Sequence, residues 1–495
     1  MRDRQIRYLY QMESFEEIHR VSEHKLRLAK GEIAFKAVCE DHVFYGESGE
    51  MEAVINTISY IRSDDKEERP VMFLWNGGPG SATSALHLEC FGPYLMKQDE
   101  DGSPVYGLTE DAESILDICD LVYVDAVGVG YSRLLDPEKW DKYYSLDGDG
   151  RSNAFAVISW LNRHKRWSSP VYLCGESYGT TRVCRILEEL ARNPVSGNRM
   201  LIGLPIKGVI LIGLALSARS DGRTIDEGIE LLPAALPSMA ATHWYHNLQG
   251  TRERDAFVEE AWAFAGEELL PALFAGEHCP SPRVKELAYR LAYFTGMESG
   301  YFVKTGLKLN DIGDFMSQVA ATKGLRVELY DARKTVPLTE MYNAVGHENV
   351  PFRIMNGLLA EKLEIETKRL YYTGNINITP GWNFESEAPM EYRKSNIQCL
   401  RDGMNRMPDM QVMTASGLYD LCTLMGNTRY LLSHNGLPAK KLKECEYPGG
   451  HGVYSSREGK RAFIADVRQM ITSRSDLQKS KAPGNTERVT TYEQI

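Results

Sequence analysis

A serine between two glycines is the first feature of the sequence that could carry chemistry. Gly175-Glu176-Ser177-Tyr178-Gly179 fits the G-x-S-x-G pattern, in which small residues let a serine occupy a sharp turn from a strand into a helix. The apolar run at 171–174 predicts the strand, and the helical periodicity of 180–190 predicts the helix. The bare pattern is weak, but this setting favours Ser177 as a nucleophile.

A serine hydroxyl becomes a good nucleophile only when a histidine accepts its proton and an acid orients that histidine. On the fold that carries this elbow, the acid and then the histidine follow the serine along the chain. Asp420 follows the apolar run 411–415, and His451 follows a Gly449-Gly450 turn. Taken singly, Asp420 also suits a helix N-cap and His451 an exposed loop. With the elbow, we predict a triad of Ser177, Asp420 and His451.

A glycine-rich loop after an early strand is the candidate for one half of an oxyanion hole. Trp75-Asn76-Gly77-Gly78-Pro79-Gly80-Ser81 follows the apolar run 71–74, and its glycines let backbone N–H groups approach a ligand closely. We predict the N–H groups of Gly78 and Tyr178 as the donors. In isolation such a cluster is simply a turn.

His243 and His246 form an HxxH pair that resembles half of a metal site. Without a glutamate partner or a third ligand the pair is weak, and packing is the better interpretation. We therefore predict no metal and no organic cofactor.

The elements that must position these residues alternate between strands and helices. The apolar runs 71–75, 121–124, 171–174, 209–214 and 411–415 read as strands, with helical stretches such as 153–165 and 181–192 between them. This alternation is typical of a mostly parallel sheet covered by helices. Together with the elbow it predicts an α/β-hydrolase fold, with antiparallel strands over 31–62 at its start.

Helical stretches dominate from 217 to 370, so this block is predicted to be a cap inserted into the sheet domain. The expected organisation is an N-terminal arm at 1–30, helical or loose, a hydrolase core at 31–216 and 371–475, and a polar tail at 476–495. A closing helix is expected at 456–473.

The composition of the chain limits which partners it can bind and indicates the cellular compartment. The net charge of −11, without a long basic run, argues against nucleic acid and anionic membranes. No signal segment and no transmembrane helix is apparent, and nine scattered cysteines fit reduced thiols. We expect a cytoplasmic protein, and the sequence leaves a homodimer open.

With these residues assembled, the chain resembles the serine carboxypeptidase family, in particular its bacterial members. The resemblance covers roughly 30–470 and follows one order of motifs: Trp75-Asn76-Gly77-Gly78-Pro79-Gly80-Ser81, Phe91-Gly92-Pro93, Asp125-Ala126-Val127-Gly128-Val129-Gly130-Tyr131-Ser132, Gly175-Glu176-Ser177-Tyr178-Gly179, Ser416-Gly417-Leu418-Tyr419-Asp420 and Gly449-Gly450-His451. The resemblance implies removal of single residues from peptides with a free C-terminus.

The resemblance also implies a subsite for the terminal carboxylate, formed by Asn76 and Glu176. Glu89 stands about one residue away from the position at which many relatives carry a second acid, and Gly452 replaces a methionine that lines the leaving-residue pocket in many relatives. Two alternatives remain at this point. One is an esterase or acyltransferase that uses the same triad, and the other is a binding protein that has kept the fold without turnover.

Overall fold

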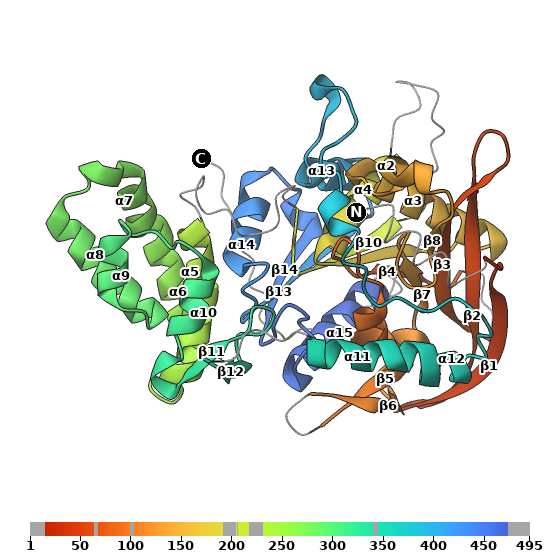
Figure 1. Cartoon of the computed structure of the whole chain (residues 1–495), viewed down its shortest axis with the longest axis horizontal. Coiled ribbons are helices and arrows are strands. Elements are labelled where there is room, and N and C mark those ends of the chain that lie inside the picture. Colours follow the sequence, from red (N-terminus) through yellow and green to blue (C-terminus); the bar gives the residue numbers. More distant parts are fainter. Residues whose placement is uncertain are drawn as a thin grey trace.

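The main body of the protein is one large twisted sheet (Figure 1). The computed structural model describes residues 15–63, 68–99, 103–191, 204, 206–216, 231–339 and 345–473. Within them the sheet has ten strands in the order β1-β2-β3-β7-β4-β9-β10-β13-β14, with β8 paired to β3. Its strands are β1 (His19–Leu28), β2 (Gly31–Tyr45), β3 (Met51–Arg62), β4 (Val71–Trp75), β7 (Asp120–Asp125), β8 (Arg133–Leu134), β9 (Val171–Glu176), β10 (Ile206–Ile212), β13 (Gln411–Gly417) and β14 (Leu442–Tyr447).

The six strands from β7 to β14 along this sheet are parallel, whereas β1, β2 and β3 are antiparallel. Strands β4, β7 and β9 are buried along their whole length, which is why the sequence shows them as continuous apolar runs. Because parallel strands end at the same edge, the loops after β4, β9, β10, β13 and β14 meet there. All the predicted catalytic residues lie in the sequence directly after these strands, so the fold brings them to this edge.

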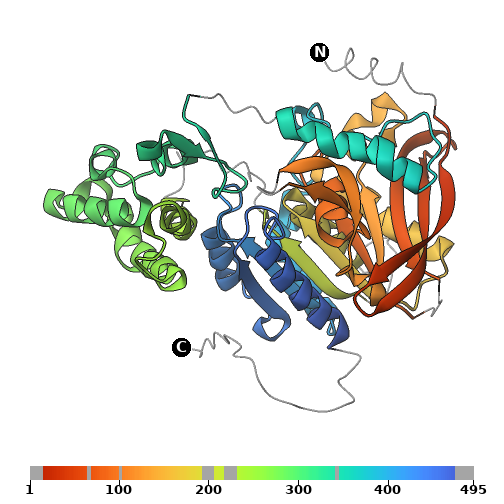
Figure 2. The same cartoon turned by 90° about the horizontal axis from the view of Figure 1, so that it is seen from below.

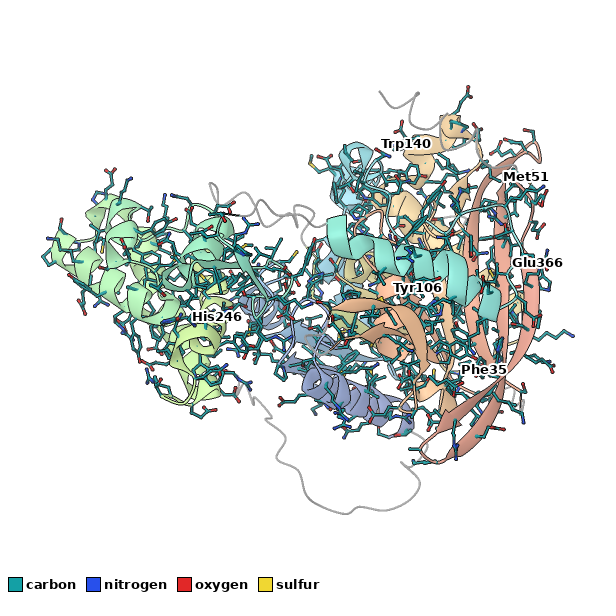
Figure 3. All side chains as sticks on the ribbon, turned by 60° about the horizontal axis from the view of Figure 1, so that its bottom comes forward. Phe35, Met51, Tyr106, Trp140, His246 and Glu366 are labelled. Carbon is teal, nitrogen blue, oxygen red and sulfur yellow. The ribbon has the colours of Figure 1, made fainter. Side chains whose placement is uncertain are left out.

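Helices cover both faces of the sheet, with α3, α4 and α13 on one face and α11 and α15 on the other in Figure 1. The helices of this body are α2 (Trp140–Tyr143), α3 (Leu146–Arg163), α4 (Tyr178–Ala191), α11 (Val345–Ile354), α12 (Ala360–Lys362), α13 (Asn396–Arg406), α14 (Met425–His434) and α15 (Arg457–Thr472), with the π-helical turns η1 (Leu86–Phe91) and η10 (Met355–Leu359). A two-stranded sheet of β5 (Tyr94–Gln98) and β6 (Pro104–Glu110) lies beside α11, and Tyr106 of β6 lies against that helix (Figure 3).

A separate helical lobe stands beside the sheet domain (Figure 2). It contains α5 (Leu231–His243), η6 (Trp244–Leu248), α6 (Arg254–Phe264), η7 (Ala265–Leu269), α7 (Leu270–Ala275), α8 (Ser281–Thr295), α9 (Ser299–Lys304), α10 (Ile312–Gln318) and a hairpin of β11 (Leu325–Val327) and β12 (Thr335–Pro337). Its core includes Phe257, Leu291 and Phe315, and it continues into Leu418 and Leu421 of the main body. The lobe therefore packs directly around the loop that follows β13.

The boundary expected for the cap, 217–370, differs from the structure. Ile354, Met355 and Leu359 belong to the core of the sheet domain, and α11 packs against β6. Helical periodicity identified these residues as helix but carried no information about which core they join. The lobe spans 231–339, and residues 217–230 lie outside the described residues.

The N-terminal segment also differs from the expected arm. Residues His19–Leu28 form β1, which pairs along its full length with β2 at the edge of the sheet. Most of its side chains are exposed, so it lacks the apolar run of an inner strand. Residues 1–14 and the predicted tail at 476–495 lie outside the described residues. Within the described parts of the chain, no helix combines the length and apolarity needed to span a bilayer.

Candidate active site

Ser177 occupies a tight turn between β9 and α4. Strand β9 ends at Glu176 and α4 begins at Tyr178, so the serine alone forms the connection. Its φ is 58°, in the left-handed region that side chains other than glycine rarely adopt, as the elbow requires. The Ser177 N–H donates to the carbonyl of Ile212 at the end of β10, over 2.9 Å. The turn therefore holds the serine above the sheet edge.

Asp420 and His451 meet beside this elbow. Nδ1 of His451 lies 2.9 Å from Oδ2 of Asp420, and both side chains are buried. The other oxygen of Asp420, Oδ1, accepts backbone N–H groups of Cys422 at 2.7 Å and Thr423 at 3.0 Å. The carboxylate is therefore fixed with one oxygen on its own loop and the other directed at the imidazole.

Electrostatics keep this imidazole basic. Burial alone lowers the pKa of His451, but the Asp420 carboxylate and its hydrogen bond outweigh burial, and Glu176 adds to them, so the pKa of His451 is raised. A histidine with a stabilised cationic form can accept a proton from a serine and hold it beside an anionic carboxylate.

Ser177 and His451 are neighbours across the end of β10. The serine N–H binds the carbonyl of Ile212, and a Cβ built on the next residue, Gly213, would lie 3.2 Å from His451 Nδ1. Among the described residues, Oγ of Ser177 makes no hydrogen bond to His451 or to any other group. The Asp420–His451 contact of the predicted triad is thus formed in the structure, whereas a Ser177–His451 hydrogen bond is not present among the described residues.

The glycine-rich loop presses against the elbow. A Cβ on Gly77 would lie 2.5 Å from the Tyr178 nitrogen and 2.7 Å from Ser177 Cβ, so only glycine fits there. Gly78 has φ +110°, which also favours glycine. In the described parts of the chain, the N–H groups of Gly78 and Tyr178 bind no other protein group. Both predicted oxyanion donors are therefore available next to the serine.

A buried ion pair supports that loop from beneath. Nε of Arg182 lies 2.8 Å from Asp149 Oδ2, and its Nη1 donates to the Asn76 carbonyl over 2.7 Å. Arg182 follows Ser177 by five residues and lies in α4, and both charged side chains are buried. Burial raises the pKa of Asp149, and the Arg182 charge opposes that rise.

Replacing Arg182 with methionine is expected to lower the free energy of unfolding by about 3 to 5 kcal/mol, because Asp149 is left as an unpaired buried charge. Denaturant unfolding of the two single variants and of the pair Arg182→Met/Asp149→Asn measures this. We expect the double variant to recover part of the loss, since it leaves no unpaired charge. A double variant as unstable as the sum of the two single variants would contradict the argument.

Four side chains form a polar cluster on the other side of the elbow. Burial raises the pKa of Glu176, which accepts hydrogen bonds from the Tyr454 hydroxyl and from Asn76. The Asn76 oxygen is occupied by the N–H of Leu86, at 3.0 Å, so its amide group faces Glu176. Burial and the nearby Glu176 charge raise the pKa of Glu89 to about 7. All three residues predicted for the carboxylate subsite are thus brought together with Tyr454.

The HxxH pair serves packing in the structure. His243 Nδ1 lies 3.2 Å from the Phe294 carbonyl, and His246 Nε2 lies 2.7 Å from the Ala332 carbonyl. Figure 3 shows His246 on the helical lobe. Within the described residues no group of three histidine, cysteine or acidic side chains is arranged to hold a metal ion.

Sequence reasoning missed several residues of this site. Tyr454 packs its ring over Gly452, where a Cβ would lie 3.0 Å from it, and so fills the space that a longer side chain at 452 would take. The Thr423 hydroxyl donates to Asp420 and lies 3.2 Å from His451 Nδ1. The ring of Tyr330, from the lobe hairpin, lies 5.3 Å from the His451 ring and is 51% exposed. For Thr423 and Tyr454 the sequence did offer a clue, because each stands three residues after a predicted catalytic residue.

Comparison with known proteins adds a family and a fold. Residues 59–224 match the sequence model of the family described as serine carboxypeptidase. This range includes the glycine-rich loop, Glu89 and the elbow, whereas Asp420 and His451 lie beyond it. No curated protein matches the chain.

Among solved structures, the chain is similar to a prohormone-processing carboxypeptidase from Saccharomyces cerevisiae, with a TM-score of 0.56 and 11% identity over 89% of this chain and 91% of that chain. A peroxisomal α/β-hydrolase from Saccharomyces cerevisiae is similar with a TM-score of 0.35 and 10% identity over 96% and 94% of the two chains. At this identity the likeness concerns the fold alone. The predicted α/β-hydrolase fold is confirmed.

Proposed function

Because residues 59–224 match the serine carboxypeptidase family model and the fold is that of the α/β-hydrolases, we propose that the chain is a serine hydrolase that removes single residues from peptides with a free C-terminus. The observation that carries this substrate class is the carboxyl pair of Glu176 and Glu89 beside the elbow, both with a raised pKa. A carboxyl that is protonated near neutral pH can donate a hydrogen bond to the terminal carboxylate of a peptide, which an ionised one would repel.

The mechanism uses the groups around the elbow in sequence. Ser177 Oγ attacks the last peptide carbonyl while His451 accepts its proton, and Asp420 stabilises the resulting imidazolium. The N–H groups of Gly78 and Tyr178 bind the oxyanion. His451 then gives the proton to the departing amino group, and the C–N bond breaks to leave an acyl-serine. Water, deprotonated by His451, releases the shortened peptide and restores the serine.

A matched pair of substrates tests the substrate class. One is an N-blocked dipeptide with a free C-terminal carboxylate, and the other is the same dipeptide as its C-terminal amide. We expect release of the terminal amino acid from the first and little or no cleavage of the second. Cleavage of small esters without release of an amino acid from the free dipeptide would instead favour an esterase.

The carboxyl pair also predicts a pH dependence of binding. Because the pKa of Glu89 is about 7, this group becomes anionic as the pH rises through 7 and then repels the substrate carboxylate. We expect KM for the free dipeptide to rise between pH 6 and pH 8, and the Glu89→Gln variant to show a much smaller rise. Steady-state kinetics across this range measure the effect.

Glu444 on β14 provides the control: desolvation of its carboxyl and the nearby Glu446 charge also raise its pKa to about 7, although the residue is exposed at the surface, and among the described residues it makes no hydrogen bond or ion pair with the site. A carboxyl whose pKa is raised by folding costs stability as the pH rises from its unfolded value, about 4.5, to its folded value. Glu89→Gln is therefore expected to raise Tm at pH 8 and to leave it unchanged at pH 4, and Glu444→Gln to show the same pattern with a smaller rise, because solvent screens its exposed side chain. Only the former should alter KM, and an equal change in KM for both would contradict the subsite.

A further inference from the structure

The hairpin of the helical lobe contacts both loops that carry the proposed acid and histidine. Residues 328–334 connect β11 to β12, and residues 329–333 of this connection make the contacts. The His451 N–H donates to the Tyr330 carbonyl over 2.6 Å, and the Leu421 N–H donates to the Leu329 carbonyl over 3.1 Å. The N–H of Ala332 donates in return to the Tyr419 carbonyl over 2.9 Å. Three backbone hydrogen bonds thus join one segment of the lobe to residues at or next to 420 and 451.

Arg333 binds both ends of the loop that carries His451, residues 448–455, which we call the histidine loop. Its Nη1 donates to the Pro448 carbonyl over 2.9 Å, and its Nη2 donates to the Ser455 hydroxyl oxygen over 3.0 Å. Pro448 and Ser455 lie on either side of His451 in the chain. The same guanidinium is oriented by Asp331, whose Oδ1 lies 2.8 Å from Nε.

Ser455 connects this network to the backbone next to the histidine. Its hydroxyl donates to Asp331 Oδ2 over 3.1 Å and accepts the Gly450 N–H over 3.1 Å. Asp331 is buried, and Arg333 and Ser455 are partly buried. A planar guanidinium with several fixed donors can hold a carboxylate, a carbonyl and a hydroxyl at once, which a single ammonium group cannot.

We propose that Arg333 is a positioning residue of the reaction, which aims the His451 imidazole by holding residues 448–455 against the lobe hairpin. The inference rests on the proposed role of His451 as the proton acceptor. A catalytic group displaced by about 1 Å can cost roughly a hundredfold in rate. Residues 448–450, which join β14 to His451, include two adjacent glycines and have little stiffness of their own, so contacts from outside this segment have to hold it in place.

Arg429 offers a matched control, because it also joins the lobe to the sheet domain. Its Nε lies 2.7 Å from Glu446 Oε1 on β14, and its Nη2 lies 2.8 Å from Glu259 Oε1 on α6. Among the described residues, its hydrogen bonds and ion pairs reach neither residues 448–455 nor the 329–333 segment. Loss of Arg429 therefore weakens the attachment of the lobe without releasing the histidine loop.

The test compares Arg333→Ala, Arg333→Lys, Arg429→Ala and Arg429→Lys in the full chain. For Arg333→Ala we expect kcat on the free dipeptide to fall by about tenfold to a hundredfold with KM changed by less than about twofold. Arg333→Lys keeps the positive charge beside Asp331 but only some of the hydrogen-bond donors of the guanidinium group, so an intermediate kcat is expected. Both Arg429 variants should keep the kcat of the unaltered protein, even where Tm is lower.

Labelling of Ser177 by a fluorophosphonate separates this inference from the proposed substrate class, because it requires an activated serine but no peptide. The labelling rate is expected to fall in Arg333→Ala by the same factor as kcat and to recover partly in Arg333→Lys. A labelling rate in folded Arg333→Ala equal to that of the unaltered protein would overturn the inference. An equal loss in the Arg429 variants would also overturn it, since attachment of the lobe would then explain the effect.

Discussion

Replacing Ser177 with alanine is expected to lower kcat/KM for the free dipeptide by roughly a millionfold, to the rate left by binding and the oxyanion donors alone. This is the largest effect we expect, because in the proposed mechanism the hydroxyl oxygen of Ser177 forms the bond to the acyl group. Alanine and serine are both L-residues with a Cβ, so the strain of φ 58° at this position is the same in either protein. The free energy of unfolding should therefore change by less than about 0.5 kcal/mol.

Two measurements check this result. Amino acid release is followed with both proteins, and each is incubated with a fluorophosphonate whose site of attachment is mapped. We expect covalent labelling at residue 177 in the unaltered protein and none in Ser177→Ala. Peptide hydrolysis or labelling that persists in Ser177→Ala would show that another residue is the nucleophile. A complete lack of both in the unaltered protein would revive the interpretation of the chain as a binding protein.

Replacing Asp420 with asparagine is expected to lower kcat by roughly ten-thousandfold through the tautomer of His451. In the structure, Oδ1 of Asp420 accepts two backbone N–H groups and Oδ2 faces the imidazole. An asparagine keeps its single oxygen on the two N–H donors, which places its NH₂ group against His451 Nδ1. Nδ1 of His451 then accepts a hydrogen bond from this NH₂ group, so the proton of the neutral imidazole lies on Nε2. The imidazole therefore has no free nitrogen left to accept the Ser177 proton.

Asp466→Asn is the control for this substitution. Asp466 accepts hydrogen bonds from the Tyr447 hydroxyl at 2.6 Å and from Lys443 at 2.8 Å, and within the described parts of the chain it makes no hydrogen bond or ion pair with a residue of the site. It should keep the kcat of the unaltered protein. KM is expected to change little in either variant, because the tautomer matters only once Ser177 gives up its proton. An Asp420→Asn protein that retains more than a tenth of the original kcat would argue against the role of Asp420.

The elbow shows how much of the site could be predicted from local sequence. Gly175, Ser177 and Gly179 lie within five residues, and the strand and helix around them follow from apolar periodicity over about ten residues on each side. The same holds for Gly77, whose close approach to the elbow demands glycine, and for Gly78, whose positive φ favours it. Such constraints act between near neighbours in the chain and leave a readable pattern.

The first strand of the sheet and the boundary of the helical lobe could not be predicted from the sequence. Strand β1 is defined by its hydrogen bonds to β2, and its exposed, charged side chains resemble those of a surface helix or loop. A helical block was expected over 217–370, but the membership of α11 and η10 in the sheet domain depends on contacts with β6 and on the burial of Ile354 and Leu359. In both cases the deciding partner is a surface whose shape exists only after folding.

The sequence alone determined the fold class, the strained turn at Ser177 and the residue types available for proton transfer, because these depend on turns and periodicities of a few residues. The tertiary structure decided that His451 lies 2.9 Å from Asp420, that Tyr454 and Glu89 join Glu176, and that the lobe hairpin fastens the histidine loop. These contacts join segments separated by up to several hundred residues. Their geometry is set by how strands order in the sheet and how the lobe packs on it, which no local pattern encodes.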